Sequence, residues 1–277
     1  MILINGVEAD SVAVKDRGFQ YGDGLFETLE ICRGKPLFLN QHFHRLTEGC
    51  YRLAIPCPDL GLLSAEINQL SSNAERAVLK LIITRGSGGR GYRQPDSILT
   101  TRVVSLHSYP DYPADYVDEG INTIFCRTRL GINPLLAGIK HLNRLEQIMA
   151  RNEWQQPEIQ EGIMLDINNY VIEGTMTNLF YSKDNTLYTA PVQASGVAGI
   201  MRSVIIALAE ANNLPLIEQY YGKEDLLAAD ELFISNSIIG IWPVKQVENH
   251  YFAVGKTTQQ LLVWLAELKQ RELKGAA

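Results

Sequence analysis

The chain has 277 residues, of which 46% are hydrophobic and 20% are charged, and its formal net charge is −6. This length allows two modest cores, and the composition is that of a globular protein. The acidic balance, without any Lys/Arg-rich run, argues against nucleic acid or a membrane surface as the main partner and favours a small-molecule ligand. No stretch approaches the roughly 18 apolar residues of a membrane span, and Glu8 lies where a secretory leader would be apolar, so we expect a cytoplasmic protein.

In the N-terminal part, Asn5-Gly6 marks a turn, and residues 2–4 and 12–14 are expected to form a pair of strands. Apolar residues then recur at helical spacing, followed by two apolar runs with strand character around a glycine-rich loop. This order predicts an α/β lobe, with helices over residues 40–53 (begun by Asn40) and 59–70, and strands over residues 78–83 and 102–106.

The stretch Tyr109-Pro110-Asp111-Tyr112-Pro113 has two prolines and interrupts both periodicities. We therefore predict a smaller N-terminal domain over residues 1–110, a linker over 111–117 and a larger domain over 118–277. The larger domain is also expected to be mixed, with strands over residues 121–126, 162–166, 177–181 and 232–235, and helices over 142–154, 200–212 and 257–273.

Several short motifs resemble known sites but lack the required context. Gly86–Gly91 fits the G-x-G-x-x-G pattern, yet the chain continues through Pro95 into a strand rather than opening a helix, so a dinucleotide site is disfavoured. Gly255-Lys256-Thr257 lacks the first glycine of a P-loop, and Ser195-Gly196 lacks the preceding glycine of a nucleophile elbow. The four cysteines are irregularly spaced, and the histidines 42 and 44 have no third ligand nearby, so we predict reduced thiols and no metal.

Lys140 lies in the apolar run LLAGIKHL, residues 135–142. Burial of an ammonium lowers its pKa and exposes an amine nucleophile, which Schiff-base formation requires. A lysine beside apolar residues can equally extend its ammonium into water. Lys140 is therefore a candidate covalent lysine that needs support from other residues.

Two further stretches could supply what a lysine-bound cofactor needs. The run SGVAGIMR, residues 195–202, is a glycine-bearing turn that enters an amphipathic helix, and a helix start offers free N–H groups to an anion such as a phosphate. Glu173 follows the apolar pair Val171-Ile172, and its carboxylate could keep a pyridine nitrogen protonated. An ordinary loop-to-helix junction and a turn acid remain the alternatives.

Together these residues resemble the class IV aminotransferases, a fold-type IV group of pyridoxal-phosphate enzymes. The family has a lysine, a later glutamate and a G-x-x-G-x-x-R helix start, which correspond here to Lys140, Glu173 and residues 196–202. The sequence DRGFQYGDGLFET of residues 16–28 and HFHRL of residues 42–46 also match family motifs. The resemblance implies a two-domain mixed α/β fold with the cofactor between the smaller N-terminal lobe and the larger C-terminal lobe.

The resemblance also implies roles for individual residues. Lys140 would carry pyridoxal 5′-phosphate, Glu173 would face its pyridine nitrogen, and Arg45 would grip its phosphate. The other expected phosphate contacts are Gly199, Ile200, Asn236 and Ser237. The family further implies a homodimer, with the Arg90 loop reaching into the neighbouring subunit.

Within the family, AGIKHLNRLE at residues 137–146 and RGSGGRGY at residues 85–92 look most like the aminodeoxychorismate lyases. Thr28 stands where branched-chain aminotransferases have glycine, and its hydroxyl could assist a proton transfer. Arg90, Tyr92 and Arg93 are the expected substrate-binding residues. The implied reaction converts 4-amino-4-deoxychorismate to 4-aminobenzoate and pyruvate, a step toward folate.

Two alternatives to a lyase stay open. One is a D-amino acid or branched-chain aminotransferase on the same fold, since a fold does not fix a reaction. Arg90 matches an arginine that D-amino acid aminotransferases use for a carboxylate, but their neighbouring histidine is absent here. The other is a protein without catalysis that binds the cofactor or a dinucleotide.

Overall fold

The computed structural model describes residues 1–275, which form two compact units. The first unit comprises Met1–Pro110, Ile139–Asn143 and the stretch that begins at Arg271, and the second comprises Asp111–Gly138 and Arg144–Gln270. The sequence-based division assigned residues 139–143 and the stretch from 271 to the larger domain, whereas their contacts group them with the first unit. The expected linker at residues 111–117 belongs to the second unit.

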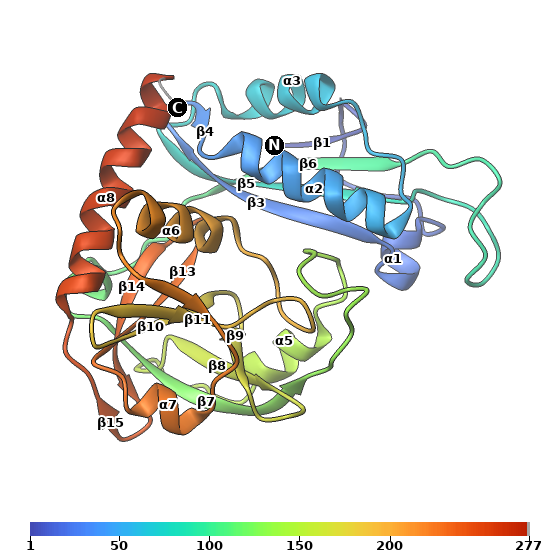
Figure 1. Ribbon diagram of the computed structural model, residues 1–277. Helices are drawn as coiled ribbons and strands as arrows, with labels where there is room; N and C mark the ends of the chain where they lie inside the picture. Colours follow the sequence, from blue (N-terminus) through green and yellow to red (C-terminus); the bar gives the residue numbers. More distant parts are fainter. Residues whose placement is uncertain (276–277) are drawn as a thin grey trace. The chain divides into compact units, whose positions relative to one another are not determined.

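The first unit is built on a six-stranded antiparallel sheet of strand order β2-β1-β6-β5-β3-β4, with helices α2 and α3 along one face (Figure 1). Strands β3 and β5 pair along their whole length, from Gly24↔Thr84 to Cys32↔Arg76. The elements are β1 (Ile2–Ile4), β2 (Val7–Glu8), α1 (Arg17–Tyr21), β3 (Gly24–Cys32), β4 (Lys35–Pro36), α2 (Leu39–Leu53), α3 (Leu60–Ser71), β5 (Arg76–Thr84) and β6 (Thr101–Ser108).

The two faces of this sheet differ in burial. Along β5, Leu79 and Leu81 are fully buried, whereas Lys80 between them is only half-buried, which is the alternation of a strand covered on one side. In β3, Leu25 packs against Gly49 of α2, where an added Cβ would lie 2.9 Å from the leucine. The opposite face, which carries Phe26, Thr28 and Lys80, is therefore left for other contacts.

The first hairpin corrects one prediction. The partner of β1 is Val7–Glu8, with Leu3↔Glu8 and Ile4↔Val7 in register, and residues 12–14 form no strand. Asn5 and Gly6 both have positive φ, 53° and 82°, as a two-residue type I′ turn requires. Such a turn reverses the chain at once, so the second strand must begin at the next residue.

The second unit contains a nine-stranded sheet. Neighbouring pairs run from β10 through β13, β14, β7 and β8 to β9, and Asn178↔Glu173 joins β9 back to β10, so six strands close into a ring. Its elements are α4 (Asp115–Asp118), β7 (Ile121–Leu130), α5 (Leu145–Arg151), β8 (Glu161–Asp166), β9 (Val171–Gly174), β10 (Asn178–Lys183), β11 (Thr186–Thr189), α6 (Ile200–Ala211), β12 (Leu216–Glu218), α7 (Lys223–Leu227), β13 (Glu231–Asn236), β14 (Gly240–Val247), β15 (His250–Tyr251) and α8 (Lys256–Lys274).

A large apolar cluster fills this unit and includes Trp154, Met164, Leu179 and Trp242, each at most 3% exposed. Every residue of β8 is buried, so this strand shows no alternation and is covered on both sides. The predicted mixed α/β class is confirmed for both units. No helix within residues 1–275 combines the length and apolar character needed to cross a membrane.

The helix expected over residues 142–154 is shorter, Leu145–Arg151. Its predicted first residues lie instead beside β3, where Leu142 N donates to Gly24 O at 3.0 Å. Pairing with a strand requires extended backbone, which excludes helix there. The helix over residues 40–53 is confirmed as α2, but it begins at Leu39 after Phe38 in the left-handed region, without an Asn40 cap.

Candidate active site

The segment around Lys140 is held as an additional edge partner of β3. Phe26 N donates to Lys140 O at 3.0 Å, and Leu25 and His141 form an antiparallel bridge. Gly24 allows this approach, because a Cβ there would collide with Ile83 O and Leu142. The backbone of Lys140 is therefore fixed by the sheet of the first unit, although the chain before residue 139 and after residue 143 belongs to the second unit.

The side chain of Lys140 is half-buried, and its Nζ lies 4.4 Å from the centre of the Phe26 ring. An ammonium over an aromatic face gains a cation–π attraction while it loses water. The neighbouring Ile139 is 1% exposed. This environment fits the expected amine nucleophile, whose reactivity depends on reduced solvation.

Beside this lysine, Glu27 of β3 forms a buried ion cluster with two residues of α2. His42 Nδ1 lies 2.6 Å from Glu27 Oε2, and Arg45 Nε donates to Oε1 at 2.8 Å. The other carboxylate oxygen accepts from Arg45 Nη2. His42 and Arg45 are three residues apart and share one face of the helix, so a single inward residue of β3 can meet both.

Burial alone raises the pKa of Glu27, but the positive charge of Arg45 and the bond from His42 outweigh it and hold the pKa at about 2. For His42, burial lowers the pKa, and the attraction of Glu27 offsets this only in part. His42 Nε2 has no hydrogen-bond partner among residues 1–275. Arg45, the expected phosphate ligand, is thus already paired with Glu27, and its phosphate role stays a prediction.

In the second unit, Glu173 is 4% exposed at the end of β9. Its Oε2 accepts a hydrogen bond from Val197 N at 2.8 Å. Gly196, with φ of 81°, leaves space beside this carboxylate, since a Cβ there would lie 3.1 Å from Oε2. The turn before α6 thus orients Glu173 through its backbone, and the carboxylate keeps acceptor capacity for a cationic ring nitrogen.

Helix α6 begins directly after this turn, with Gly199 as its N-cap and no side-chain cap. The N–H groups of its first turn, which include Ile200, have no intrahelical acceptor and carry the positive end of the helix dipole. A Cβ on Gly199 would collide with Asn178 Oδ1, so only glycine fits here. Asn178 Nδ2 in turn donates to Val197 O at 2.9 Å, which ties the turn to β10.

Asn236 and Ser237, also expected at the phosphate, lie at the turn between β13 and β14. Asn236 Oδ1 accepts from Ile238 N at 2.8 Å and Ile239 N at 2.9 Å, and Nδ2 donates to Met176 O at 3.2 Å. The Asn236 side chain therefore stabilises the turn itself, and a phosphate contact at this position would come from Ser237 or from the backbone.

Glu161 is a buried residue that no sequence pattern had indicated as part of the site. It is 1% exposed, and its Oε1 accepts from Gly162 N at 2.9 Å and from Thr175 Oγ1 at 2.5 Å. Its Oε2 accepts from Thr177 Oγ1 at 2.9 Å. Burial raises the pKa of Glu161, and these uncharged donors oppose that rise only in part. The carboxylate fixes the loop after Glu173, and its threonine partners lie 14 and 16 residues further along the chain, so no local pattern connects them to Glu161.

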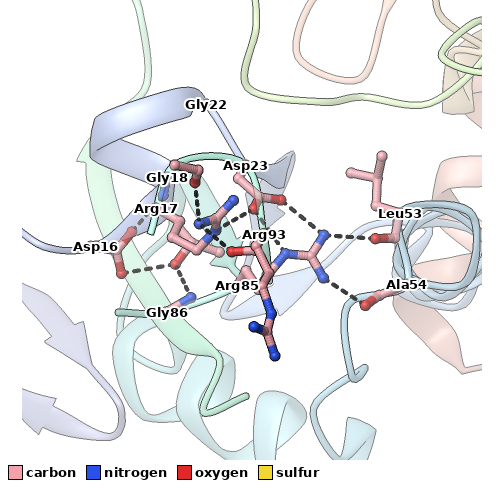
Figure 2. Close-up of polar contacts among 12 residues, drawn as sticks. Asp16, Arg17, Gly18, Gly22, Asp23, Leu53, Ala54, Arg85, Gly86 and Arg93 are labelled. Carbon is pink, nitrogen blue, oxygen red and sulfur yellow. Dashed lines mark hydrogen bonds and ion pairs between the residues drawn. The ribbon is translucent and has the colours of Figure 1, made fainter. Parts of the chain in front are cut away.

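The loop that carries Arg90, Tyr92 and Arg93 is anchored by a second buried network (Figure 2). Arg17 Nη1 donates to Gly91 O at 3.0 Å and to Arg93 O at 3.3 Å, while its Nε donates to Asp23 Oδ2 at 2.8 Å. Arg85 donates to the same carboxylate at 2.8 and 3.0 Å. Burial raises the pKa of Asp23, but Arg85 and Arg17 reverse this and leave it below its usual value.

Arg85 also reaches across to the end of α2, where Nη2 donates to Leu53 O and Nη1 to Ala54 O, each at 2.7 Å (Figure 2). The loop is therefore tied to α1 and α2, although no helix follows it before β6, as expected. Tyr92 is 90% exposed, and its ring stands edge-on to Tyr21 at 5.8 Å.

Thr28 lies two residues beyond Phe26 on the same face of β3 and is half-buried. Its hydroxyl makes no hydrogen bond to any residue of the described range, so it is available to a ligand. Its partner in register on β5 is Lys80. Thr28 and Phe26, whose ring lies 4.4 Å from Lys140 Nζ, thus share one face of β3.

The residues of the second unit fit a cofactor with a phosphate and a basic ring nitrogen. The start of α6 has no side-chain cap, so its free N–H groups could donate to a phosphate, and Glu173 is a buried carboxylate. Two fully buried hydroxyls, those of Ser195 and Ser235, have no partner among the described residues. A buried donor without a hydrogen-bond partner lowers stability by about 1–3 kcal/mol. A ligand that accepts from these hydroxyls would remove that cost.

Comparisons with known proteins agree with this geometry. The family model for class IV aminotransferases matches residues 24–247. An aminodeoxychorismate lyase from Vibrio harveyi is 36% identical over 265 residues, which cover 94% of this chain and 98% of the relative. A D-alanine aminotransferase from Bacillus licheniformis is 31% identical over 252 residues, 88% of this chain and 86% of the relative.

Among solved structures, the crystal structure of 4-amino-4-deoxychorismate lyase from Pseudomonas aeruginosa is similar, with a TM-score of 0.93 and 42% identity. The match covers 96% of this chain and 98% of that chain. The sequence-based recognition is therefore confirmed, and the chain belongs to the class IV aminotransferase family of pyridoxal-phosphate enzymes.

Proposed function

We propose that this protein is a pyridoxal-phosphate-dependent lyase that converts 4-amino-4-deoxychorismate to 4-aminobenzoate and pyruvate. The observation that carries the proposal is the half-buried Lys140, fixed on the edge of β3 beside the Glu27 cluster. The choice of a lyase is supported by the match to an aminodeoxychorismate lyase at 42% identity over 96% of the chain.

In this proposal, Lys140 holds the cofactor covalently through its amine. The phosphate would be bound by the backbone at Gly199 and Ile200, by Arg45, and by Ser237 with the turn that Asn236 stabilises. A doubly charged phosphate away from water needs several donors at once, and the free N–H groups of α6 meet that requirement. The unpartnered hydroxyls of Ser195 and Ser235 offer further donors.

Glu173 would accept a hydrogen bond from the pyridine nitrogen of the cofactor and so keep it protonated. When bound, pyridoxal phosphate withdraws electrons from the carbon that bears the substrate amine. Val197 N holds Glu173 in place for this contact, and Glu161 holds the loop that follows.

Lys140 also moves the protons. With pyridoxal phosphate bound, the amine of Lys140 would take the proton from the amine-bearing ring carbon of the substrate, and loss of the enolpyruvyl oxygen would then make the ring aromatic. Thr28 or Lys140 returns a proton to the departing group. Arg90, with Tyr92 and Arg93 beside it, binds a substrate carboxylate from its anchored loop.

We further propose a cytoplasmic homodimer in which the Arg90 loop contributes to the partner's site. The exposed position of Arg90 and Tyr92, on a loop whose backbone is nevertheless fixed by Arg17, supports a role toward a second copy. A monomer that is fully active at assay concentration in sedimentation would exclude this arrangement.

The function is tested by incubating the purified protein with 4-amino-4-deoxychorismate and measuring 4-aminobenzoate and pyruvate. Lys140→Ala should abolish both products and the borohydride-reducible linkage, which mass spectrometry of the digested protein detects. Lys15→Ala, at an exposed position, is the matched control and should keep both. Transfer from an amino donor to 2-oxoglutarate, without 4-aminobenzoate formation, would instead identify an aminotransferase.

A further inference from the structure

Cys50 and Cys57 are two thiols of the first unit that the proposed reaction does not use. Cys50 lies near the end of α2 and is fully buried, whereas Cys57 follows the helix and is exposed. A hydrogen bond joins their side chains. The Cys57 sulfur also lies 3.8 Å from Oγ1 of Thr47, which precedes Cys50 by about one turn on the same face of α2. The chain therefore folds back on its own helix and places an accessible thiol against a buried one.

The backbone between the two cysteines favours this contact. Ala54 ends α2 in the left-handed region, with φ of 51°, and so turns the chain back. Cys57 itself lies between Pro56 and Pro58. A proline fixes its own φ and restricts the residue before it to extended backbone. Few conformations of this segment would therefore carry Cys57 away from Cys50.

The arrangement suits the formation of a disulfide. A disulfide needs sulfur atoms about 2.05 Å apart and Cα atoms about 4.4–6.8 Å apart. Two thiols in hydrogen-bond contact already have their sulfur atoms close together, and Cys57 lies in an exposed segment outside any helix or strand. A small movement of Cys57 would thus bring the two sulfur atoms to bonding distance.

The two thiols differ in how they meet an oxidant. Burial, the charge of the Cys57 thiolate and the hydrogen bond to it raise the pKa of Cys50 to about 12. A buried thiol that stays protonated at neutral pH is inert toward peroxides. Cys57 is exposed and is the thiol that a peroxide meets first. Its oxidation removes the thiolate charge, and with it one cause of the raised pKa of Cys50.

We propose that Cys50 and Cys57 form a reversible oxidation site, in which Cys57 reacts with a peroxide and Cys50 resolves the product. The peroxide transfers one oxygen atom to the Cys57 sulfur, its O–O bond breaks, and water or an alcohol leaves. The Cys50 sulfur then attacks the sulfenic acid, the S–O bond breaks, and the hydroxyl leaves as water with the Cys50 proton. Exchange with a dithiol reductant returns both thiols.

The position of the site indicates what the disulfide protects. Without a resolving thiol, further oxidation of Cys57 gives a charged sulfinate, which is irreversible. This charge would stand just after the end of α2, where Leu53 O and Ala54 O each accept from Arg85 at 2.7 Å (Figure 2). Arg85 in turn binds Asp23 within the network that anchors the substrate loop. A disulfide adds no charge there. This inference does not depend on the proposed lyase reaction.

The test exposes the cofactor-loaded protein to hydrogen peroxide, blocks the remaining thiols with N-ethylmaleimide and analyses a non-reduced tryptic digest by mass spectrometry. Cleavage after Arg52 separates Cys50, on peptide 46–52, from Cys57, on peptide 53–76. The disulfide should therefore appear as these two peptides linked, with the loss of two hydrogen atoms. Treatment with dithiothreitol before the digest should return both peptides unlinked.

Each single variant should lose the linked peptide for a different reason. In Cys50→Ala, dimedone should trap the sulfenic acid of Cys57, and without dimedone Cys57 should gain two oxygen atoms that dithiothreitol does not remove. In Cys57→Ser, Cys50 should keep a free thiol. Cys32→Ala is the matched control and should form the linked peptide. Thermal melting before treatment checks that each variant is folded, and Cys50→Val, of similar volume, replaces an alanine variant that does not fold.

Three results would overturn the proposal. If the unmodified protein gave no linked peptide and Cys57 accumulated two oxygen atoms, Cys50 would not be a resolving thiol. If peptide 53–76 were linked to a second copy of itself, Cys57 would pair between chains and not with Cys50. If Cys57 stayed unreacted while free cysteine in the same solution was oxidised, the site would not exist. Formation of 4-aminobenzoate by the untreated protein tests the lyase function separately.

Discussion

The two units hold buried carboxylates by different means. In the first unit, Glu27 is paired with His42 and Arg45, and its pKa falls to about 2. In the second, Glu161 is as deeply buried but accepts only from backbone N–H groups and threonine hydroxyls, and its pKa is raised. Burial raises the pKa of both carboxylates, so the charge of the hydrogen-bond partners decides whether the net pKa shift is downward or upward.

The contrast has a chemical meaning for Glu173, which is also held by a backbone N–H. Glu173 accepts from Val197 N and also feels the charge of Arg144, whereas Glu27 of β3 is paired directly with His42 and Arg45 of α2. In our proposal, the protonated ring nitrogen of the cofactor would be a further partner of Glu173. Four substitutions and one pH dependence would break or sharpen this comparison.

The largest effect is expected from Glu173→Gln. Loss of one partner of a buried ion pair costs about 3–5 kcal/mol, so kcat should fall about 10²–10⁴-fold in cofactor-saturated protein. Cofactor affinity should fall less, because the phosphate contacts remain. The measurement is turnover with cofactor loading followed by absorbance, and Glu173→Asp is the conservative control. Full turnover in the loaded glutamine variant would remove Glu173 from the mechanism.

Glu27→Gln should lower the free energy of unfolding by about 3 kcal/mol, because it leaves the guanidinium of Arg45 with a neutral partner in a buried site. Urea denaturation of the protein without cofactor measures this directly. The exposed ion pair between Arg33 and Glu75 offers a control. Because Glu75→Gln loses only this surface contact, it should change the free energy of unfolding by less than about 1 kcal/mol. Equal effects of the two changes would contradict the ion-cluster assignment.

The same cluster predicts an acid dependence with a defined sign. The folded pKa of Glu27 is about 2 and its ordinary value is 4.5, so its contribution is fully present above pH 4.5 and is lost as the pH falls toward 2. The difference in unfolding free energy between the unmodified protein and Glu27→Gln should therefore shrink by about 2–3 kcal/mol over that window. A constant difference would mean that the carboxylate is not charged in the folded protein.

Glu161→Gln should have a smaller effect, about 1–2 kcal/mol, because the amide oxygen still accepts while its NH₂ faces donors that the carboxylate satisfied. The contribution of Glu161 to the free energy of unfolding should change with pH in the opposite direction to that of Glu27. Since the folded pKa of Glu161 is raised, its charged form destabilises the fold, and this penalty is relieved as the pH falls through the folded pKa. If Glu161→Gln lowered the free energy of unfolding as much as Glu27→Gln does, the cationic partners of Glu27 would not be what distinguishes the two carboxylates.

The smallest effect is expected at Arg17. Arg17→Ala removes two bonds to the loop, but Asp23 keeps Arg85, so stability should fall by only about 1 kcal/mol. Loop opening should rise about fivefold, measured as the rate of tryptic cleavage after Arg90 and Arg93. Arg76→Ala, which loses Glu30 and no loop contact, is the control. Unchanged cleavage would mean that the loop is not anchored by Arg17.

Much of the fold could be predicted from local patterns. The helices α2, α3 and α6 and the strands β5 and β6 have clear periodicity, and Asp59 indeed caps α3 through Leu62 N at 2.8 Å. The family motifs also led to Lys140 and Glu173. Strand β3 was not identified as a strand, because its residues were read as a motif and its register with β5 depends on the tertiary fold.

The side-chain partnerships could not be predicted. Glu27 and His42 are fifteen residues apart, and Arg17 meets the loop seventy-four residues later, so no local pattern connects them. Glu161 lies in a strand that is buried on both sides, where a carboxylate contradicts the apolar pattern. Such conflicts between pattern and structure are resolved only by partners that the fold brings together.

The placement of residues 139–143 in the sheet of the first unit has a consequence for how the polypeptide is synthesised. When residues 1–110 leave the ribosome, the Gly24 end of β3 has no neighbour on one side, and its N–H and C=O groups form an open edge. Synthesis proceeds at about 5–20 residues per second, so this edge stays unpaired for seconds until Lys140 arrives. The nascent N-terminal part is therefore the stage most prone to aggregation, and it becomes protected when the covalent lysine is in place.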